Sequence, residues 1–213
     1  MHTDELVRML STGLEPVPTG AARQRWSVAL MLSMPIAFAW MWWSLGLLPT
    51  LSTTVTSPMF WLKLGLPSVL LIAGLLAATR LARPGARLGH TPWLIGTPLV
   101  LIWALAAFSL IDAPPNTRQA LLYGDSWQMC PFLIAELSVP TFIAGLWAMR
   151  GLAPTYLRRA GAAAGLLAGA VGALVYALHC PELAAPFIGL WYVLGIALPA
   201  AFGACLGPRL LRW

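Results

Sequence analysis

Long apolar stretches alternate with short polar ones along this chain, and the apolar stretches number six. Each has about the 20 residues that a helix needs to cross the hydrocarbon core of a bilayer. The six stretches are Trp26–Leu48, Pro58–Thr79, Thr91–Ile111, Pro131–Met149, Leu157–Leu178 and Leu183–Leu206. The pattern therefore predicts an all-α integral membrane protein with six transmembrane helices, here called the first to the sixth.

The N-terminal segment, residues 1–25, is polar and precedes this six-helix transmembrane domain, residues 26–213. Its apolar residues recur at three- and four-residue spacing, which predicts a short amphipathic helix. The shared face holds Leu6, Val7, Leu10 and Leu14. Asp4 falls in the first turn, where the helix dipole favours an acid. A helix of about three turns is marginal alone in water, so we expect it to lie on a partner protein or on the membrane surface.

Charged residues are few, and their distribution predicts the orientation of the chain. They make up 9% of the residues, against 59% that are hydrophobic, whereas a soluble domain carries about a quarter charged residues. Eleven of the 13 lysines and arginines lie in the N-terminal segment, the second-to-third and fourth-to-fifth loops and the C-terminus. Because such residues mark the cytoplasmic side, both termini are predicted to be cytoplasmic. The net positive charge is explained in the same way and does not indicate direct nucleic-acid binding.

The reactive side chains gather at the predicted outer ends of the fourth and fifth helices. Cys130 and Cys180 each precede a proline there, and His179 adjoins Cys180. The short turn between these helices predicts that they are neighbours with both thiols at similar depth. Three arrangements remain open: a permanent disulfide, a reversible thiol or metal-binding switch, or thiols that never meet. An imidazole favours a reactive thiolate, and two thiols with an imidazole suit a soft or borderline metal ion, with Glu182 or Asp125 as a fourth ligand.

Small residues predict how the fifth helix packs. Gly161, Gly165, Gly169 and Ala173 fall four apart, and such a stripe lets another backbone approach closely. We expect this stripe to allow the approach of the fourth helix that a disulfide would require. The third cysteine, Cys205, lies in the sixth helix without polar neighbours and is expected to be inert.

Glu136 lies six residues into the fourth helix, about 9 Å from its outer end. An acid at this depth is costly and is expected to face the bundle interior or a partner. A proton- or cation-linked role and a hydrogen-bonded packing role both fit it. No constellation of catalytic residues accompanies it, so no enzyme activity is predicted. No cofactor is expected either, and a soft or transition metal ion enters only as a signal.

The last two helices resemble those of a known family. The matching stretches are Ala160–Gly169, Tyr176–Glu182, Phe187, Trp191–Tyr192, Gly195–Ile196 and Gly207–Trp213. They resemble the NrsF family, six-span bacterial membrane anti-sigma factors that negatively regulate an extracytoplasmic-function sigma factor of the sigma-F kind. Thr3–Val7, Leu10 and Pro16–Val17 resemble that family's N-terminus, although Pro18–Gly20 stand where arginines often follow in the family.

The resemblance implies that the N-terminal segment holds the sigma factor and that Cys130 and Cys180 sense an oxidant or a heavy metal. We therefore predict an anti-sigma factor of the bacterial inner membrane, with a sigma factor and membrane lipid as its partners. The alternative is a small transporter or permease, with Glu136 as its coupling group and a structural disulfide between the two cysteines.

Overall fold

The computed structural model describes residues 3–12, 20–83, 85–152 and 154–212. Within these ranges the chain is largely helical and forms no strand. The elements are α1 (Thr3–Ser11), α2 (Ala21–Ser44), α3 (Leu51–Thr54), α4 (Pro58–Leu81), α5 (Thr91–Asp112), α6 (Pro115–Tyr123), α7 (Cys130–Arg150), α8 (Leu157–Tyr176), α9 (Ala185–Phe187), the π-helical turn η1 (Ile188–Tyr192) and α10 (Val193–Leu210).

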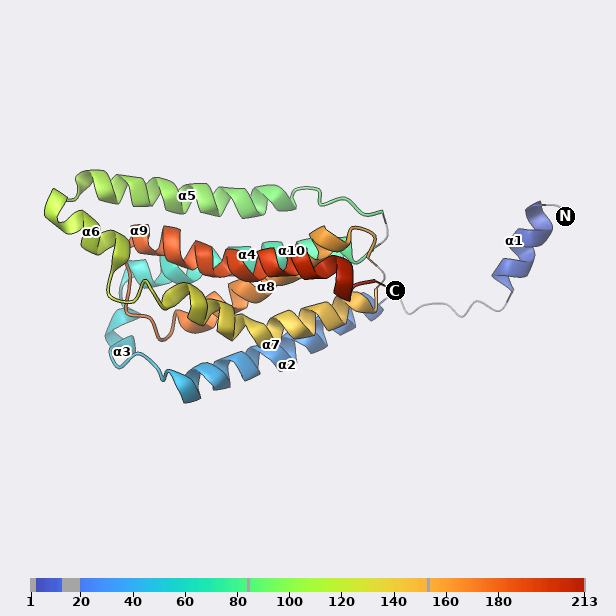
Figure 1. Ribbon diagram of the computed structural model, residues 1–213, viewed down its shortest axis with the longest axis horizontal. Helices are drawn as coiled ribbons and strands as arrows, with labels where there is room; N and C mark the ends of the chain where they lie inside the picture. The colour runs from blue at the N-terminus through green and yellow to red at the C-terminus, as the bar shows by residue number, and fades with distance from the viewer. Residues whose placement is uncertain (1–2, 13–19, 84, 153, 213) are drawn as a thin grey trace.

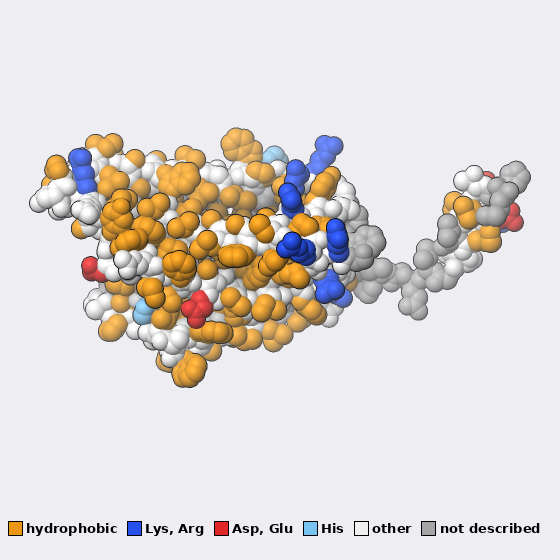
Figure 2. All heavy atoms as spheres, in the orientation of Figure 1, with side chains coloured by type: hydrophobic (Ala, Val, Ile, Leu, Met, Phe, Trp, Pro, Cys, Tyr) orange, Lys and Arg blue, Asp and Glu red, His pale blue; other side chains and the backbone are white. Residues whose placement is uncertain are grey.

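Six helical segments in the described ranges are long and apolar enough to cross a membrane. They are α2, α4, α5, α7, α8 and the continuous segment Ala185–Leu210. Their outward surface is strongly apolar (Figure 2): Trp43 is 91% exposed, Ile111 77% and Met31 75%. Soluble proteins rarely expose so much contiguous apolar surface, so this surface fits lipid. The prediction of six apolar helices is confirmed, and the predicted outer loops additionally contain the short helices α3 and α6.

Helix α8 is the centre of the bundle. It packs against α10, α7, α4 and α2, and most of it is buried, whereas α5 lies at the periphery (Figure 1). Alanine and glycine make up 11 of its 20 residues. Small side chains allow backbones to come close where hydrophobic attraction between helices is weak, as it is in lipid. The composition of α8 therefore explains its central position.

The glycine stripe of α8 faces α10, and the prediction that it faces the fourth helix is wrong. A Cβ at Gly161 would overlap the Gly203 carbonyl, and one at Gly165 would overlap the Pro199 carbonyl. The approach to α7 depends on a different residue, Gly172, where a Cβ would meet Ile134 and Ser138. Sequence spacing identified the small face correctly, but several neighbouring helices compete for such a face.

Gly165→Leu is expected to prevent the close packing of α8 and α10, because the new side chain would occupy the space of the Pro199 backbone. Overpacking a core costs about 1–3 kcal/mol even for smaller insertions. The yield of monodisperse protein in detergent and its unfolding temperature should both fall. The control is Gly96→Leu on α5, where a Cβ would meet nothing within 4 Å. Equal losses from both substitutions would contradict this packing.

The two ends of the bundle differ chemically. Figure 2 shows most Lys and Arg side chains at the end where the C-terminus lies, called here the arginine end. The opposite end, formed by α3, α6 and the loop 177–184, carries both Cys130 and Cys180 and is called here the thiol end (Figure 1). α1 lies beyond the arginine end, apart from the bundle (Figure 1). The helices thus connect a thiol site at one end with the N-terminal segment at the other.

Candidate functional site

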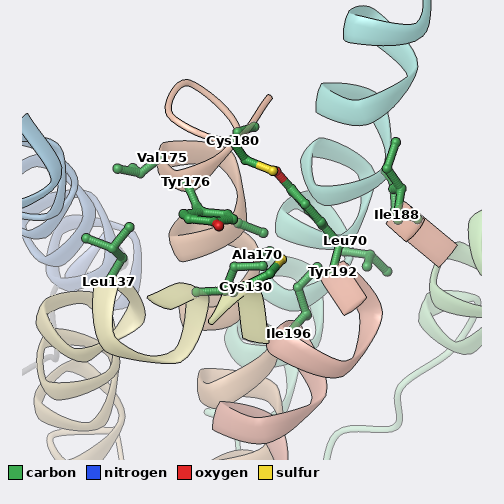
Figure 3. Packing of buried hydrophobic residues seen from close by; sticks show 14 of the residues in the cluster. Leu70, Cys130, Leu137, Ala170, Val175, Tyr176, Cys180, Ile188, Tyr192 and Ile196 are labelled. Atoms are coloured by element: carbon green, nitrogen blue, oxygen red, sulfur yellow. The ribbon is translucent and has the colours of Figure 1, made fainter. Parts of the chain in front are cut away.

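Both cysteines of the thiol end belong to one buried apolar cluster. Cys130 is 0% exposed and Cys180 is 1% exposed, and both are free cysteines. Tyr176 of α8 and Tyr192 of η1 belong to the same cluster and are almost fully buried (Figure 3). The prediction that the thiols lie at the same end, on neighbouring helices, agrees with the contact of α7 with α8.

Each cysteine is placed by the end of a helix. Cys130 is the first residue of α7, and its N–H donates to the Ser126 carbonyl at 3.0 Å. Cys180 follows α8, and its N–H donates to the Tyr176 carbonyl at 3.0 Å. The Ser126 hydroxyl lies 3.9 Å from the Cys180 sulfur. Ser126 therefore connects the first turn of α7 to the sulfur that follows α8.

A second link joins the two cysteine-bearing segments. The Asp125 N–H donates to the Glu182 carboxylate at 2.8 Å. This approach depends on Gly124, which has φ +52° and where a Cβ would meet the Glu182 carboxylate. The sequence makes Asp125 and Glu182 candidates for a fourth metal ligand, but the structure pairs the Asp125 backbone with the Glu182 side chain.

Lys63 of α4 contacts Cys180, and the sequence pattern did not predict this contact. It is the sixth residue of α4 and is 0% exposed. Its ammonium donates to the Cys180 carbonyl at 2.5 Å and lies 5.5 Å from the centre of the Tyr192 ring. The sequence did contain an indication of its importance, because a charged residue inside an apolar stretch marks a candidate functional position. The pattern could not show that this charge meets the cysteines.

The π-helical turn η1 positions Tyr192. Such turns are rare and occur often at functional sites. The Trp191 indole donates to the Leu122 carbonyl of α6 at 2.9 Å, and the Trp103 indole of α5 donates to the Gly189 carbonyl at 2.9 Å. Held in this way, Tyr192 extends toward the Cys180 sulfur (Figure 3), and its hydroxyl has no hydrogen-bond partner among the described residues.

His179 does not join the cysteines. Its Nδ1 lies 3.0 Å from the Gly46 carbonyl, and its ring packs beside Tyr176 at 5.9 Å between centroids. In the described ranges, no three His, Cys, Asp or Glu side chains lie close enough together to hold a metal ion. The structure therefore does not preassemble the metal site considered for Cys130, Cys180 and His179. A soft metal ion would have to use the two thiols or rearrange the loop.

Glu136 and Cys205 lie outside this cluster. Glu136 is exposed on the outer surface of α7. The expectation that it faces the bundle interior is therefore wrong, whereas contact with a partner stays a prediction. This position gives no support to the transporter alternative, in which Glu136 would line a path through the bundle. Cys205 is exposed on α10.

The predicted N-terminal helix exists as α1. It is nine residues long, with Asp4 and Glu5 in its first turn. Leu6 is 41% exposed and Val7 59% exposed. Leu14 and the side chain of Leu10 lie outside the described residues. The apolar side chains described here thus remain available to a partner.

Comparisons with known proteins give one consistent result. The family described as "Negative regulator of sigma F", NrsF, matches residues 10–213. The chain is 48% identical over 213 residues to a protein of Azospira oryzae named "Probable anti-sigma-F factor NrsF". It is 36% identical over 219 residues to the "Anti-sigma-F factor NrsF" of Caulobacter vibrioides. Both alignments cover all of this chain and all of the relative. No solved structure matches the chain.

Proposed function

The chain belongs to the NrsF family of negative regulators of sigma F, and we propose that it is a thiol-sensing anti-sigma factor of a bacterial inner membrane. It holds an extracytoplasmic-function sigma factor through α1 and releases it when Cys130 and Cys180 react. The observation that carries this proposal is the placement of two free thiols in one buried cluster, at the opposite end of the bundle from α1. The arginine end then faces the cytoplasm, following the distribution of positive charge.

Binding by α1 follows a helix-in-groove mode. Its apolar face, with Leu6 and Val7 exposed, is buried in a groove of the sigma factor, together with Leu10 and Leu14. Asp4 contributes a charge near the start of the helix. Because an isolated nine-residue helix is marginal in water, its stability in the cell comes from this partner.

The thiols offer two balanced reactions. A two-electron oxidant such as a peroxide converts two thiols and one H₂O₂ to a disulfide and two waters. A soft divalent cation instead replaces the two thiol protons and forms two metal–thiolate bonds. Either product changes the distance between the Cys130 and Cys180 sulfurs. The apolar cluster must then repack, because close-packed interiors have little spare volume.

The helices provide a connection between the two ends. α7 begins at Cys130 and packs along α2, which leads back to the N-terminal segment. Shifting an equilibrium from 1:99 to 99:1 requires about 5.5 kcal/mol of differential free energy. A disulfide or two metal–thiolate bonds formed in only one packing of α7 and α8 can supply a difference of this size.

A reconstituted complex tests the proposal. The tagged full-length chain is purified in detergent with its sigma factor bound, then exposed to peroxide or to Cd²⁺. We expect the sigma factor to elute from the immobilised chain after exposure and to remain bound in buffer. A sigma factor that never binds, or that stays bound under both treatments, would contradict the proposed function.

A further inference from the structure

We propose that Lys63 is a positioning residue of the thiol site: its buried positive charge holds Cys180 ready to react as a thiolate. This inference rests on the proposed function, since it concerns the same sensing thiols. It adds a residue on α4 to a site otherwise built from α7, α8 and the segments beside them.

Lys63 forms no salt bridge among the described residues. Its recorded partners among the described residues are the carbonyl of Cys180 and the face of Tyr192, both neutral. Burying an ionised group without an opposite charge is costly even after relaxation. A lysine kept at 0% exposure within an apolar helix is therefore costly unless a neighbouring group can become negative.

Loss of a thiol proton can supply a negative charge beside Lys63. The titratable groups that neighbouring elements place beside Lys63 are Cys130 on α7, Tyr176 on α8, Tyr192 in η1, and Cys180 and Glu182 in the loop after α8. His179 of the same loop contacts the Gly46 carbonyl instead, and Glu136 of α7 is exposed on the outer surface. Glu182 is a carboxylate, but in the described ranges it forms no salt bridge with Lys63 and instead accepts the Asp125 N–H. Of the remaining groups, thiols ionise more readily than phenols. The ammonium binds the carbonyl of Cys180 itself, which is only four covalent bonds from the sulfur.

Burial and a nearby cation act on a thiol in opposite directions. Burial in apolar surroundings makes cysteine inert, whereas a neighbouring lysine or a helix N-terminus stabilises the thiolate. Proton transfer from a thiol to a neutral Lys63 amine gives a thiolate and an ammonium without changing the net charge of the cluster. Both proposed reactions, with an oxidant and with a soft metal, need the thiolate form.

The test is the pH dependence of thiol alkylation in the purified full-length chain, in a Cys205→Ser background. Iodoacetamide reacts with the thiolate, forms a thioether and releases iodide, and peptide mass spectrometry reports Cys130 and Cys180 separately. A cation close to an ionisable group shifts its ionisation by about 1–3 pH units. Lys63→Met should therefore slow alkylation of Cys180 at pH 7 by about tenfold or more, with the rates converging at high pH.

Lys63→Arg is the matched control, because it keeps the charge and should preserve the pH profile. Loss of packing alone would change how often the buried cluster opens to the reagent. Because this opening does not depend on ionisation of the thiol, the alkylation rate would then change by the same factor at every pH. A pH-independent change in Lys63→Met, or no change, overturns the inference. If Lys63→Met does not fold, the pH profile of alkylation in the unsubstituted chain still tests the inference. Half-maximal alkylation at or above about pH 8.5, the value for an ordinary free cysteine, overturns the inference as well.

The measurement uses no sigma factor, so its outcome is independent of the proposed release. A Lys63-dependent pH profile without release of the sigma factor would refute the proposed function alone. Release without a Lys63-dependent profile would refute this inference alone.

Discussion

Deleting residues 1–18 is expected to abolish recovery of the sigma factor with the detergent-solubilised chain. The apolar side chains of α1 have no place in the bundle and remain exposed at Leu6 and Val7. In the proposed complex they are buried in the groove of the sigma factor. The measurement is co-purification of the two proteins with the tag at the C-terminus, so that the deletion leaves the tag unaffected.

A finer variant separates the apolar face from the presence of the segment. Replacing Leu6 and Val7 together by alanine retains helix propensity and removes apolar contact worth about 1.5 kcal/mol at each position. That loss corresponds to about a hundredfold weaker binding. The matched control replaces Glu5 and Arg8 by alanine, because these exposed residues of α1 fall on the opposite face of the helix. Equal recovery of the sigma factor with and without residues 1–18 would contradict the proposal that α1 binds it.

Cys130→Ser and Cys180→Ser are each expected to abolish the response to oxidant or soft metal. Serine has nearly the shape of cysteine, but it forms no disulfide and binds soft metals poorly. Because the proposed product joins both sulfurs, either substitution alone should leave the sigma factor bound. In a transcriptional reporter, induction by the stressor should fall to about the uninduced level in each single variant.

Cys205→Ser is the control for this experiment. Cys205 lies exposed on α10, outside the thiol cluster, so its replacement should leave induction unchanged. An intact response in either the Cys130 or the Cys180 variant would argue strongly against a paired site. Loss of response in Cys205→Ser would indicate that a sensing residue lies outside the thiol end.

The sequence was sufficient to predict the six apolar helices and to predict that Cys130 and Cys180 lie at the same end of the bundle. Apolar length alone defines a transmembrane helix, since the bilayer fixes the number of residues needed. Helix order then fixes which loops share an end, so Cys130 and Cys180 could be placed together. α1 was predictable for a similar reason, because its face repeats with the helical period at Leu6, Val7 and Leu10.

The sequence was not sufficient for contacts that depend on which faces meet. The stripe at Gly161 and Gly165 fits any close backbone, and only the three-dimensional packing directs it to α10. Lys63 is separated from Cys180 by 117 positions, so periodicity gave no indication of their contact. The π-helical turn that positions Tyr192 has no recognisable local signal. The exposed position of Glu136 likewise depends on how α7 is rotated within the bundle.

The central claim is that chemistry at two thiols controls a helix at the other end of the bundle. The most direct measurement follows the free thiols of Cys130 and Cys180 in intact cells during stress, together with bound sigma factor, in the Cys205→Ser chain. Acid quenching, denaturation and mass-tagged alkylation report oxidation, and native alkylation reports protection by a metal. We predict that both cysteines lose reactivity together, and before or as the sigma factor is released. Release while both thiols remain free would contradict the account.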